Sequence, residues 1–260
     1  MECGDNESDN RFDGVCDKDG CDYNHWRQGD KTYFGMGADF QVDSSKPMTV
    51  VTQFHTHDGT DNGDLVEVRR IYVQDGKVIS NSVTNWEGMQ DWDSITDEMC
   101  EEQKIVFNDF NDHGEKGGLK TMGESLARGH VLVMSMWDDH SVDMLWLDSD
   151  YPLDRDPSEP GVSRGPCPRD SGDPEDVENR YPDATVTFSN IKVGPHCSTF
   201  PGCETPPGPT TTTEKPTPST TTGDNSDCPG GSLDSCISMC PENPAEIFQA
   251  CVNQCMAQCM

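Results

Sequence analysis

Apolar and polar residues partly alternate in several short runs between residues 48 and 194. A period of two predicts strands that bury one face, and these runs are rich in the β-branched and aromatic residues that strands favour. Turn-forming residues separate the runs. The strands expected from this pattern are residues 48–54, 66–76, 77–83, 130–139, 143–149 and 184–194.

Two segments between these runs show the pattern of helices instead. Residues 94–107 begin with Ser94, which is expected to cap the first turn. Residues 118–129 carry leucine and methionine on one helical face and end at Gly129. Because strands outnumber helices, the pattern predicts a mainly β fold built as an antiparallel sandwich.

The net charge of the chain limits the kinds of molecule that it can bind. The chain has 260 residues and a formal net charge of -30, with only 18 lysines and arginines. Such a surface repels nucleic acid and anionic membranes, but it does not repel a neutral polysaccharide. No apolar run approaches the ~20 residues that span a bilayer. We therefore expect neither a nucleic-acid nor a membrane partner.

The cysteine content indicates an oxidising compartment. Thirteen cysteines in this length are typical of a secreted, extracellular protein with disulfides. The first residues, MECGDNESDN, have neither the basic nor the apolar part of a signal peptide. We therefore expect the natural N-terminus to lie upstream of Met1. The odd cysteine count agrees, since at least one cysteine then lacks an internal partner.

The C-terminal part changes composition twice. Residues 197–227 are predicted to be a linker, because they contain the threonine- and proline-rich stretch TPPGPTTTTEKPTPSTTT. Residues 228–260 hold six cysteines at helical spacing and are predicted to form a small disulfide-bonded helical hairpin. Zinc binding is the alternative for this segment, although the spacing is unusual for a zinc finger. The favoured pairs are Cys236–Cys255, Cys240–Cys251 and Cys228–Cys259, among fifteen pairings that six cysteines permit.

The acidic stretch around Asp17 allows three interpretations: a calcium loop, a sugar-binding wall or a solvated surface. An EF-hand counted from Asp17 would need an acid or amide at position five, glycine at six and glutamate at twelve. Those positions hold Cys21, Asp22 and Gln28, so the template fails. A calcium site of another type remains an alternative.

Aromatic and charged residues are interleaved here and again downstream. Sugar sites combine aromatic rings that pack on pyranose faces with charged groups that bond hydroxyls. Core packing is the alternative for each single tryptophan. The candidate residues are Arg11, Asp19, Asp22, Tyr23, Trp26 and Arg27, then Trp137, Asp138, Asp139 and Trp146, with both later tryptophans expected on successive strands.

Several stretches together resemble the C-terminal half of glycoside hydrolase family 7. These are DNRFDGVCDKDGCDYN, MTVVTQF, YVQDG, KGGL, VLVMSMWDD, MLWLDS, SRGPC and VTFSNIKVGP, in the family's order. The resemblance spans nearly all of residues 1–196, the expected catalytic part. It implies a concanavalin-like β-sandwich (jelly roll), cellulose or another β-1,4-glucan as substrate, a monomer and no cofactor or metal.

The resemblance also implies roles for individual residues. Trp137 and Trp146 resemble platforms for glucose units on the product side of the cut, and Tyr23 stands where members often have tryptophan. Cys21 and Cys100 match a family disulfide, while Cys3, Cys16 and Cys167 match cysteines whose partners lie upstream. The implied polar and loop residues of the substrate site are Arg11, Asp19, Asp22, Arg27, Asp138, Tyr151 and Arg164.

The family's catalytic motif is not found in this sequence. Members carry a nucleophile and an acid/base carboxylate in an E-x-D-x-x-E motif, in which alternation puts the first two carboxylates on one face. Glu7-Ser8-Asp9 begins such a motif, but Phe12 stands where the last glutamate is needed. We therefore expect no catalytic residue in this chain and place the motif upstream of Met1.

The loop of residues 147–167, which ends near Arg164, has the length typical of exo-acting members. The resemblance therefore implies a retaining cellulose 1,4-β-cellobiosidase as the parent enzyme, with this chain as an inactive fragment. The alternatives are an endo-acting cellulase, a non-catalytic glucan-binding remnant and an acidic calcium-binding module.

Overall fold

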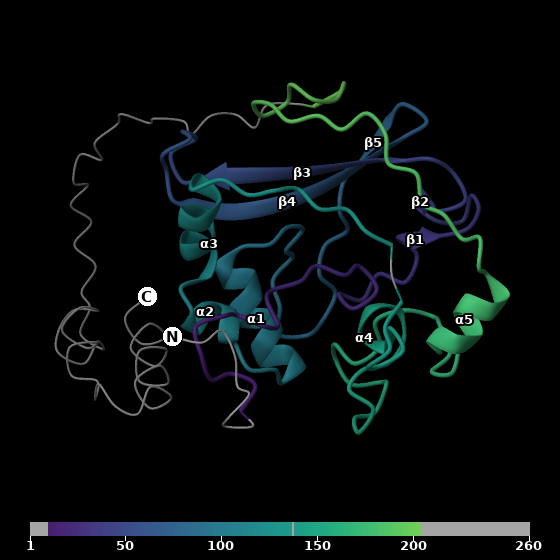
Figure 1. Cartoon of the computed structure of the whole chain (residues 1–260). Coiled ribbons are helices and arrows are strands. Elements are labelled where there is room, and N and C mark those ends of the chain that lie inside the picture. The colour runs from purple at the N-terminus through teal and green to yellow at the C-terminus, as the bar shows by residue number, and fades with distance from the viewer. Residues whose placement is uncertain (1–9, 137, 204–260) are drawn as a thin grey trace, which may run out of the picture. The chain divides into compact units, whose positions relative to one another are not determined.

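The computed structural model describes residues 10–136 and 138–203 (Figure 1). The chain separates into two compact units, Met1–Pro206 and Pro207–Met260. The predicted helical hairpin, with Cys236, Cys240, Cys251 and Cys255, lies outside the described residues, as does most of the linker. Those predictions, and the proposed domain boundaries, therefore remain predictions.

The main sheet has three antiparallel strands. They are β3 (Thr49–Thr56), β4 (Leu65–Gln74) and β5 (Lys77–Ile79), in the order β3-β4-β5. Asp75 and Gly76 join β4 to β5 with φ values of 51° and 76°, the left-handed conformation of a tight two-residue hairpin. The strands predicted at 48–54, 66–76 and 77–83 are thus confirmed, although β5 is shorter than expected.

A second, parallel pair of short strands packs beside this sheet. It consists of β1 (Phe34–Gly35) and β2 (Val42–Asp43). Gln74 at the end of β4 holds β2 through its side-chain amide, which accepts from the Asp43 backbone N–H and donates to its carbonyl, both at 2.9 Å. The small core therefore forms where the two sheets meet; its buried members are Tyr33, Val42, Tyr72 and Ile79.

His25 belongs to the same core through ring stacking. Its imidazole lies parallel to the Tyr33 ring with centroids 3.4 Å apart, and only 6% of the residue is exposed. Nδ1 lies 3.1 Å from the Ser82 hydroxyl. Because burial disfavours the charged form, it lowers the pKa of His25 to about 4.

We expect His25 to make the fold sensitive to mild acid. Below pH 6.5 the unfolded chain takes up a proton that the folded chain accepts only near pH 4, so stability falls between these values and is unaffected above them. The loss reaches about 3 kcal/mol. Denaturant unfolding at several pH values gives the free energy of unfolding. Between pH 6.5 and 4 this free energy should change less steeply with pH for His25→Gln than for the wild type. His57→Gln, in an exposed loop, should keep the wild-type slope; equal slopes for all three proteins would contradict the prediction.

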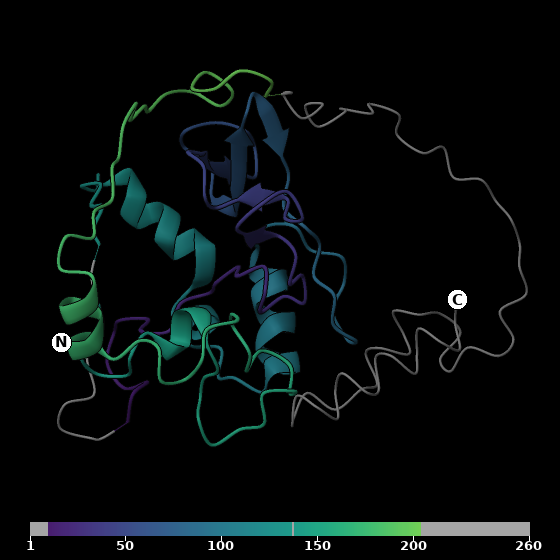
Figure 2. The same ribbon diagram turned by 90° about the vertical axis from the view of Figure 1, so that its right-hand side faces the viewer.

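The first long helix is α1 (Asp97–Phe107), which lies below the main sheet in the views of Figures 1 and 2. Thr96 caps it by accepting from the Met99 N–H at 3.1 Å, so the prediction of Ser94 as the cap is wrong. Ser94 is instead buried beside β4, because the Val68–Ile95 bridge holds this segment extended until Thr96.

The second expected helix is also present. It is α3 (Gly118–Ala127), and it begins and ends at left-handed glycines, Gly117 and Gly129. Gly123 lets it approach β4 closely, since a Cβ there would lie 2.6 Å from the Leu65 Cβ. The shorter helices are α2 (Asp112–Glu115), α4 (Leu145–Asp148) and α5 (Pro174–Arg180).

Three predicted strands are wrong. Residues 130–136 and 184–194 are not in strands, and α4 occupies the segment predicted as a strand at 143–149. Alternating side chains favour a strand only where a neighbouring backbone offers hydrogen bonds, and within the described ranges no strand pairs with these residues. Their apolar side chains are accordingly exposed, as with Val131 at 87% and Val193 at 94%.

Before α4 the backbone turns sharply. Asp143 and Met144 both take positive φ values, 55° and 61°, and direct Leu145 into the interior as the helix starts.

No helix of the described residues is long and apolar enough to cross a membrane.

Candidate functional site

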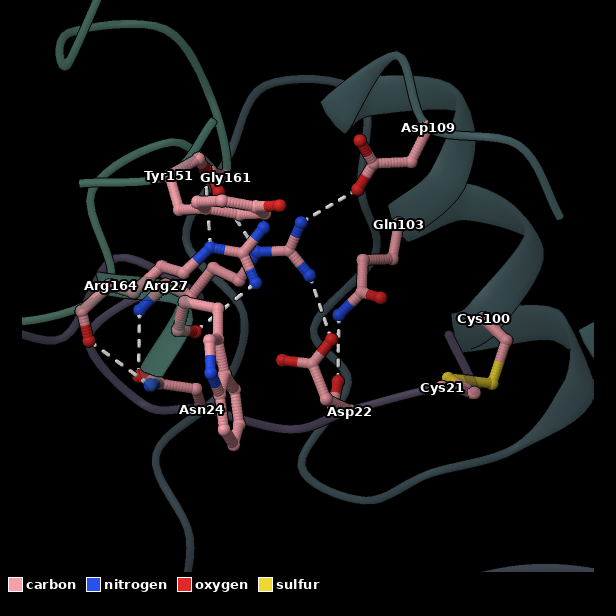
Figure 3. Close-up of polar contacts among 12 residues, drawn as sticks. Cys21, Asp22, Asn24, Arg27, Cys100, Gln103, Asp109, Tyr151, Gly161 and Arg164 are labelled. Atoms are coloured by element: carbon pink, nitrogen blue, oxygen red, sulfur yellow. Dashed lines mark hydrogen bonds and ion pairs between the residues drawn. A yellow bond between two sulfur atoms is a disulfide. The ribbon is translucent and has the colours of Figure 1, made fainter. Parts of the chain in front are cut away.

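A buried arginine is the centre of the candidate site (Figure 3). The Arg27 side chain is 3% exposed and bridges two carboxylates: its Nη1 donates to Asp22 Oδ1 at 2.7 Å and its Nη2 to Asp109 Oδ2 at 2.6 Å. Its Nε donates to the Gly161 carbonyl at 2.9 Å, and its guanidinium lies 4.6 Å from the centre of the Phe107 ring. Every nitrogen of the guanidinium is therefore engaged, which fixes its position.

A tight turn places Arg27 in this position. The Asn24 side chain accepts from the Arg27 backbone N–H at 3.0 Å, while its amide donates to the carbonyls of Leu147 and Arg164 at 3.2 and 3.0 Å. Asn24 thus joins the turn to the segments around α4 and Arg164, which lie more than 120 residues further along the chain. The sequence motifs did not predict this role for Asn24.

Arg164 and Tyr151 complete the cluster. Arg164 Nε donates to the Tyr151 carbonyl at 3.2 Å, its Nη1 to the Trp146 carbonyl at 3.4 Å, and its guanidinium lies 5.6 Å from the centre of the Tyr151 ring. Burial, with a smaller contribution from the positive charge of Arg27, lowers the pKa of Arg164 to about 10. Arg164 therefore stays charged at neutral pH.

The predicted disulfide between Cys21 and Cys100 is confirmed. It has an S–S distance of 2.05 Å and links residues 79 apart in sequence. One turn later on α1, Gln103 donates from its amide to the Asp22 carbonyl at 2.7 Å. The covalent bond and this hydrogen bond together hold the segment of Asp22 and Arg27 against the helix.

We call Asp22, Arg27, Asp109, Tyr151 and Arg164 the Arg27 cluster. Four of its members were predicted from sequence, and Asp109 was missed. Asp109 follows α1 directly and gives no sign in the sequence that it pairs with a residue 82 positions away. Arg27 organises the cluster. The half-exposed Asp22 carboxylate can accept hydrogen bonds from a polar, uncharged ligand, and the Arg164 guanidinium can donate them.

Other predicted residues lie elsewhere. Arg11 and Asp19 pair with each other on the exposed segment before Cys21. The Tyr23 hydroxyl lies 2.5 Å from the Ser82 carbonyl and 2.7 Å from that of Trp92. Burial raises the pKa of Tyr23.

The prediction that Trp146 lies on a strand is wrong. Trp137 lies outside the described residues, and Trp146 lies in α4 rather than on a strand. The Trp146 Nε1 donates to Asp139 Oδ2 at 2.9 Å, and Asp138 faces His140. The Trp146 carbonyl accepts from Arg164 of the Arg27 cluster.

Carboxylates of the acidic stretch have protein partners. Asp17 accepts from the Gly20 N–H at 2.8 Å and lies 3.1 Å from His113 Nδ1, while Asp19 and Asp22 bind arginines. Within the described residues this stretch is therefore a wall held by ion pairs, which favours the sugar-binding interpretation over a calcium loop.

The disulfides of the structure differ from the expected ones in two ways. Cys16 is disulfide-bonded in this chain, so the prediction that its partner lies upstream of Met1 is wrong. Cys197 and Cys203 form a disulfide that the linker prediction missed. Cys167 is a half-buried free thiol among the described residues, and its predicted upstream partner remains a prediction.

A comparison with family models matches glycosyl hydrolase family 7 over residues 1–200. The chain belongs to glycosyl hydrolase family 7. The resemblance read from its motifs is thus confirmed, and with it a relationship to β-sandwich glycosidases.

Solved family 7 structures agree with this assignment. A cellobiohydrolase from Daphnia pulex is 57% identical, with a TM-score of 0.66 and coverage of 68% of this chain and 40% of that one. A cellobiohydrolase from Melanocarpus albomyces, solved with cellotetraose, is 41% identical, with a TM-score of 0.61 and coverage of 70% and 40%. An endocellulase from Humicola insolens is 39% identical, with a TM-score of 0.55 and coverage of 66% and 38%.

This chain therefore spans about 40% of the length of the first two family 7 enzymes.

Proposed function

We propose that this family 7 chain supplies the product-side wall of a cellulose groove in a secreted, monomeric cellobiohydrolase. The observation that carries the proposal is the Arg27 cluster, in which predicted substrate residues from two distant segments, 22–27 and 151–164, meet. Its hydrogen-bonding groups suit the hydroxyls of a neutral sugar. Relatives solved with cellotetraose and with cellobiose support a β-1,4-glucan as the ligand.

We propose further that hydrolysis retains the anomeric configuration and needs carboxylates supplied by sequence upstream of Met1. Retaining enzymes need two carboxyl groups about 5–5.5 Å apart. No E-x-D-x-x-E motif occurs in these 260 residues. Arg164 would donate to the leaving cellobiose in fixed directions. Asp22, which Arg27 holds in place, would accept from its hydroxyls.

Cellobiose release from amorphous cellulose tests this proposal. We expect no release by the chain alone and release by a version extended upstream to include the motif. Activity of the short chain would contradict the carry-over of the catalytic residues and redirect attention to Asp138 and Asp139. Inactivity of both versions would favour the alternative, a non-catalytic glucan-binding remnant.

An endo-acting cellulase is the second candidate, since endocellulases are also among the similar structures. The long loop that carries Tyr151 and Arg164 supports the exo-acting assignment. The ratio of soluble to insoluble reducing ends released from cellulose separates the two: an exo-acting enzyme gives mostly soluble cellobiose.

Trp146→Ala in the extended enzyme should weaken hydrolysis of crystalline cellulose more than that of a soluble substrate. Loss of one sugar–aromatic stack weakens binding of a cellulose chain by about 1 kcal/mol, roughly fivefold. Hydrolysis of crystalline cellulose is affected more because it requires the enzyme to bind cellulose chains repeatedly. Initial rates on both substrates give the comparison, with Trp146→Phe as the variant that keeps a ring. Equal losses on both substrates would contradict a stacking role.

A further inference from the structure

Three metal-ligating side chains converge outside the Arg27 cluster. His140 Nε2 lies 3.5 Å from Asp138 Oδ1 and 3.3 Å from Glu178 Oε1. All three ligand atoms lie within 4.8 Å of one another. Asp138 and His140 belong to the segment before α4, whereas Glu178 lies on α5, so the group joins two separate parts of the chain.

The two separations from His140 Nε2 fit ligands arranged around one cation. A metal held at about 2.0–2.2 Å by nitrogen and carboxylate oxygen separates neighbouring tetrahedral ligands by about 3.4 Å. The contacts of 3.3 and 3.5 Å bracket that value. They are longer than the charge-assisted hydrogen bonds of about 2.7–2.9 Å that imidazolium makes with carboxylates. The spacing therefore suits shared coordination better than direct pairing.

Within the part of the chain that the structure describes, no lysine or arginine competes for the two carboxylates. Among the described residues, the ion pairs of Asp138 and Glu178 are those with His140. The nearby Arg180 on α5 is already paired with Asp176 at 2.8 Å. A protein with a net charge of -30 also concentrates cations at its surface. The electrostatic setting favours a bound cation.

A metal ion can reach these side chains from solvent, and the neighbouring carboxylate of Asp139 is not one of the proposed ligands. The side chains of His140 and Glu178 are 71% and 60% exposed, so an ion reaches them without rearrangement of the core. Asp139 instead accepts from the Ser141 N–H and from Trp146 Nε1, both at 2.9 Å. Those hydrogen bonds leave Asp138 as the carboxylate of this segment that faces His140.

We propose that Asp138, His140 and Glu178 bind a divalent transition-metal ion such as Zn²⁺, with water in the remaining position. One imidazole and two carboxylates suit Zn²⁺ or Co²⁺, whereas Ca²⁺ takes six to eight oxygen ligands. The ion ties α5 to the segment before α4. The metal site does not rest on the proposed hydrolysis, although Asp138 was also predicted as a substrate residue.

Titration of the oxidised full chain with Co²⁺, followed by visible absorption, tests the site. We expect saturable bands of a nitrogen- and oxygen-ligated ion, without thiolate-to-metal charge transfer, and displacement by Zn²⁺. His140→Ala and Glu178→Gln should each weaken binding tenfold or more. Glu175→Gln, the same charge change on the same helix, should leave binding unchanged.

Three results would overturn the proposal: no saturable binding, bands dominated by thiolate charge transfer, or affinities that His140→Ala and Glu178→Gln leave unchanged. The second would assign the metal to cysteines. Because both variants alter exposed side chains, far-UV circular dichroism should match that of the wild type, and a change there would require His140→Asn in place of alanine.

Discussion

Arg27→Ala is expected to lower the free energy of unfolding by about 3–5 kcal/mol, because it removes the shared partner of two carboxylates. Asp22 and Asp109 would face each other without the cation, and the Gly161 carbonyl would lose its donor. The packing of the guanidinium on Phe107 would also be lost. Urea denaturation monitored by tryptophan fluorescence measures the change.

Arg11→Ala is the matched control. The Arg11 side chain is 57% exposed and pairs with Asp19 near the surface, where removing an ion pair costs less than about 1 kcal/mol. Arg27→Lys should fall between the two, since it keeps the charge but cannot make all three side-chain hydrogen bonds. Similar losses for Arg27→Ala and Arg11→Ala would contradict the central position assigned to Arg27.

Replacing both Cys21 and Cys100 with serine is expected to cost about 4–5 kcal/mol. The disulfide closes a loop between residues 79 apart, and the entropy that it removes from the unfolded chain grows with loop length. It also holds the Asp22–Arg27 segment against α1. Thermal and urea unfolding of the double variant, compared with the wild type, measure the loss.

The double replacement of Cys197 and Cys203 by serine provides the comparison. These residues are only 6 apart, so the same entropy relation gives about 2 kcal/mol. Both double variants remove two cysteines and leave no new unpaired thiol at the site. A larger effect from the short loop than from the long one would contradict the assignment of Cys21–Cys100 as the main covalent tie.

Local patterns predicted local structure well. Alternation and the Asp75-Gly76 turn specify the β4–β5 hairpin, because both depend on residues a few positions apart. The α3 helix was also predicted, since its apolar face and its terminal glycine lie within one short segment. The cap of α1 was misplaced by two residues because a bridge to β4, which the sequence does not reveal, keeps Ser94 extended.

The strands predicted at 130–139 and 184–194 show the limit of periodicity. Val131 and Val193 have the alternation of buried strand residues, yet they are exposed in this structure. A strand is stabilised by hydrogen bonds to a neighbour, and the pattern of one segment cannot state whether that neighbour is present. The same reason explains why residues 145–148 form a helical turn instead.

The sequence by itself determined the family, the acidic and cysteine-rich character, and most residue types of the candidate site. Only the tertiary structure decided which of these meet: Asp22, Arg27, Tyr151 and Arg164 gather with the unforeseen Asp109, whereas Arg11, Tyr23 and the Trp146 ring point elsewhere. Motifs record residue types in order along the chain, but contacts between residues 82 to 140 positions apart depend on how the backbone folds.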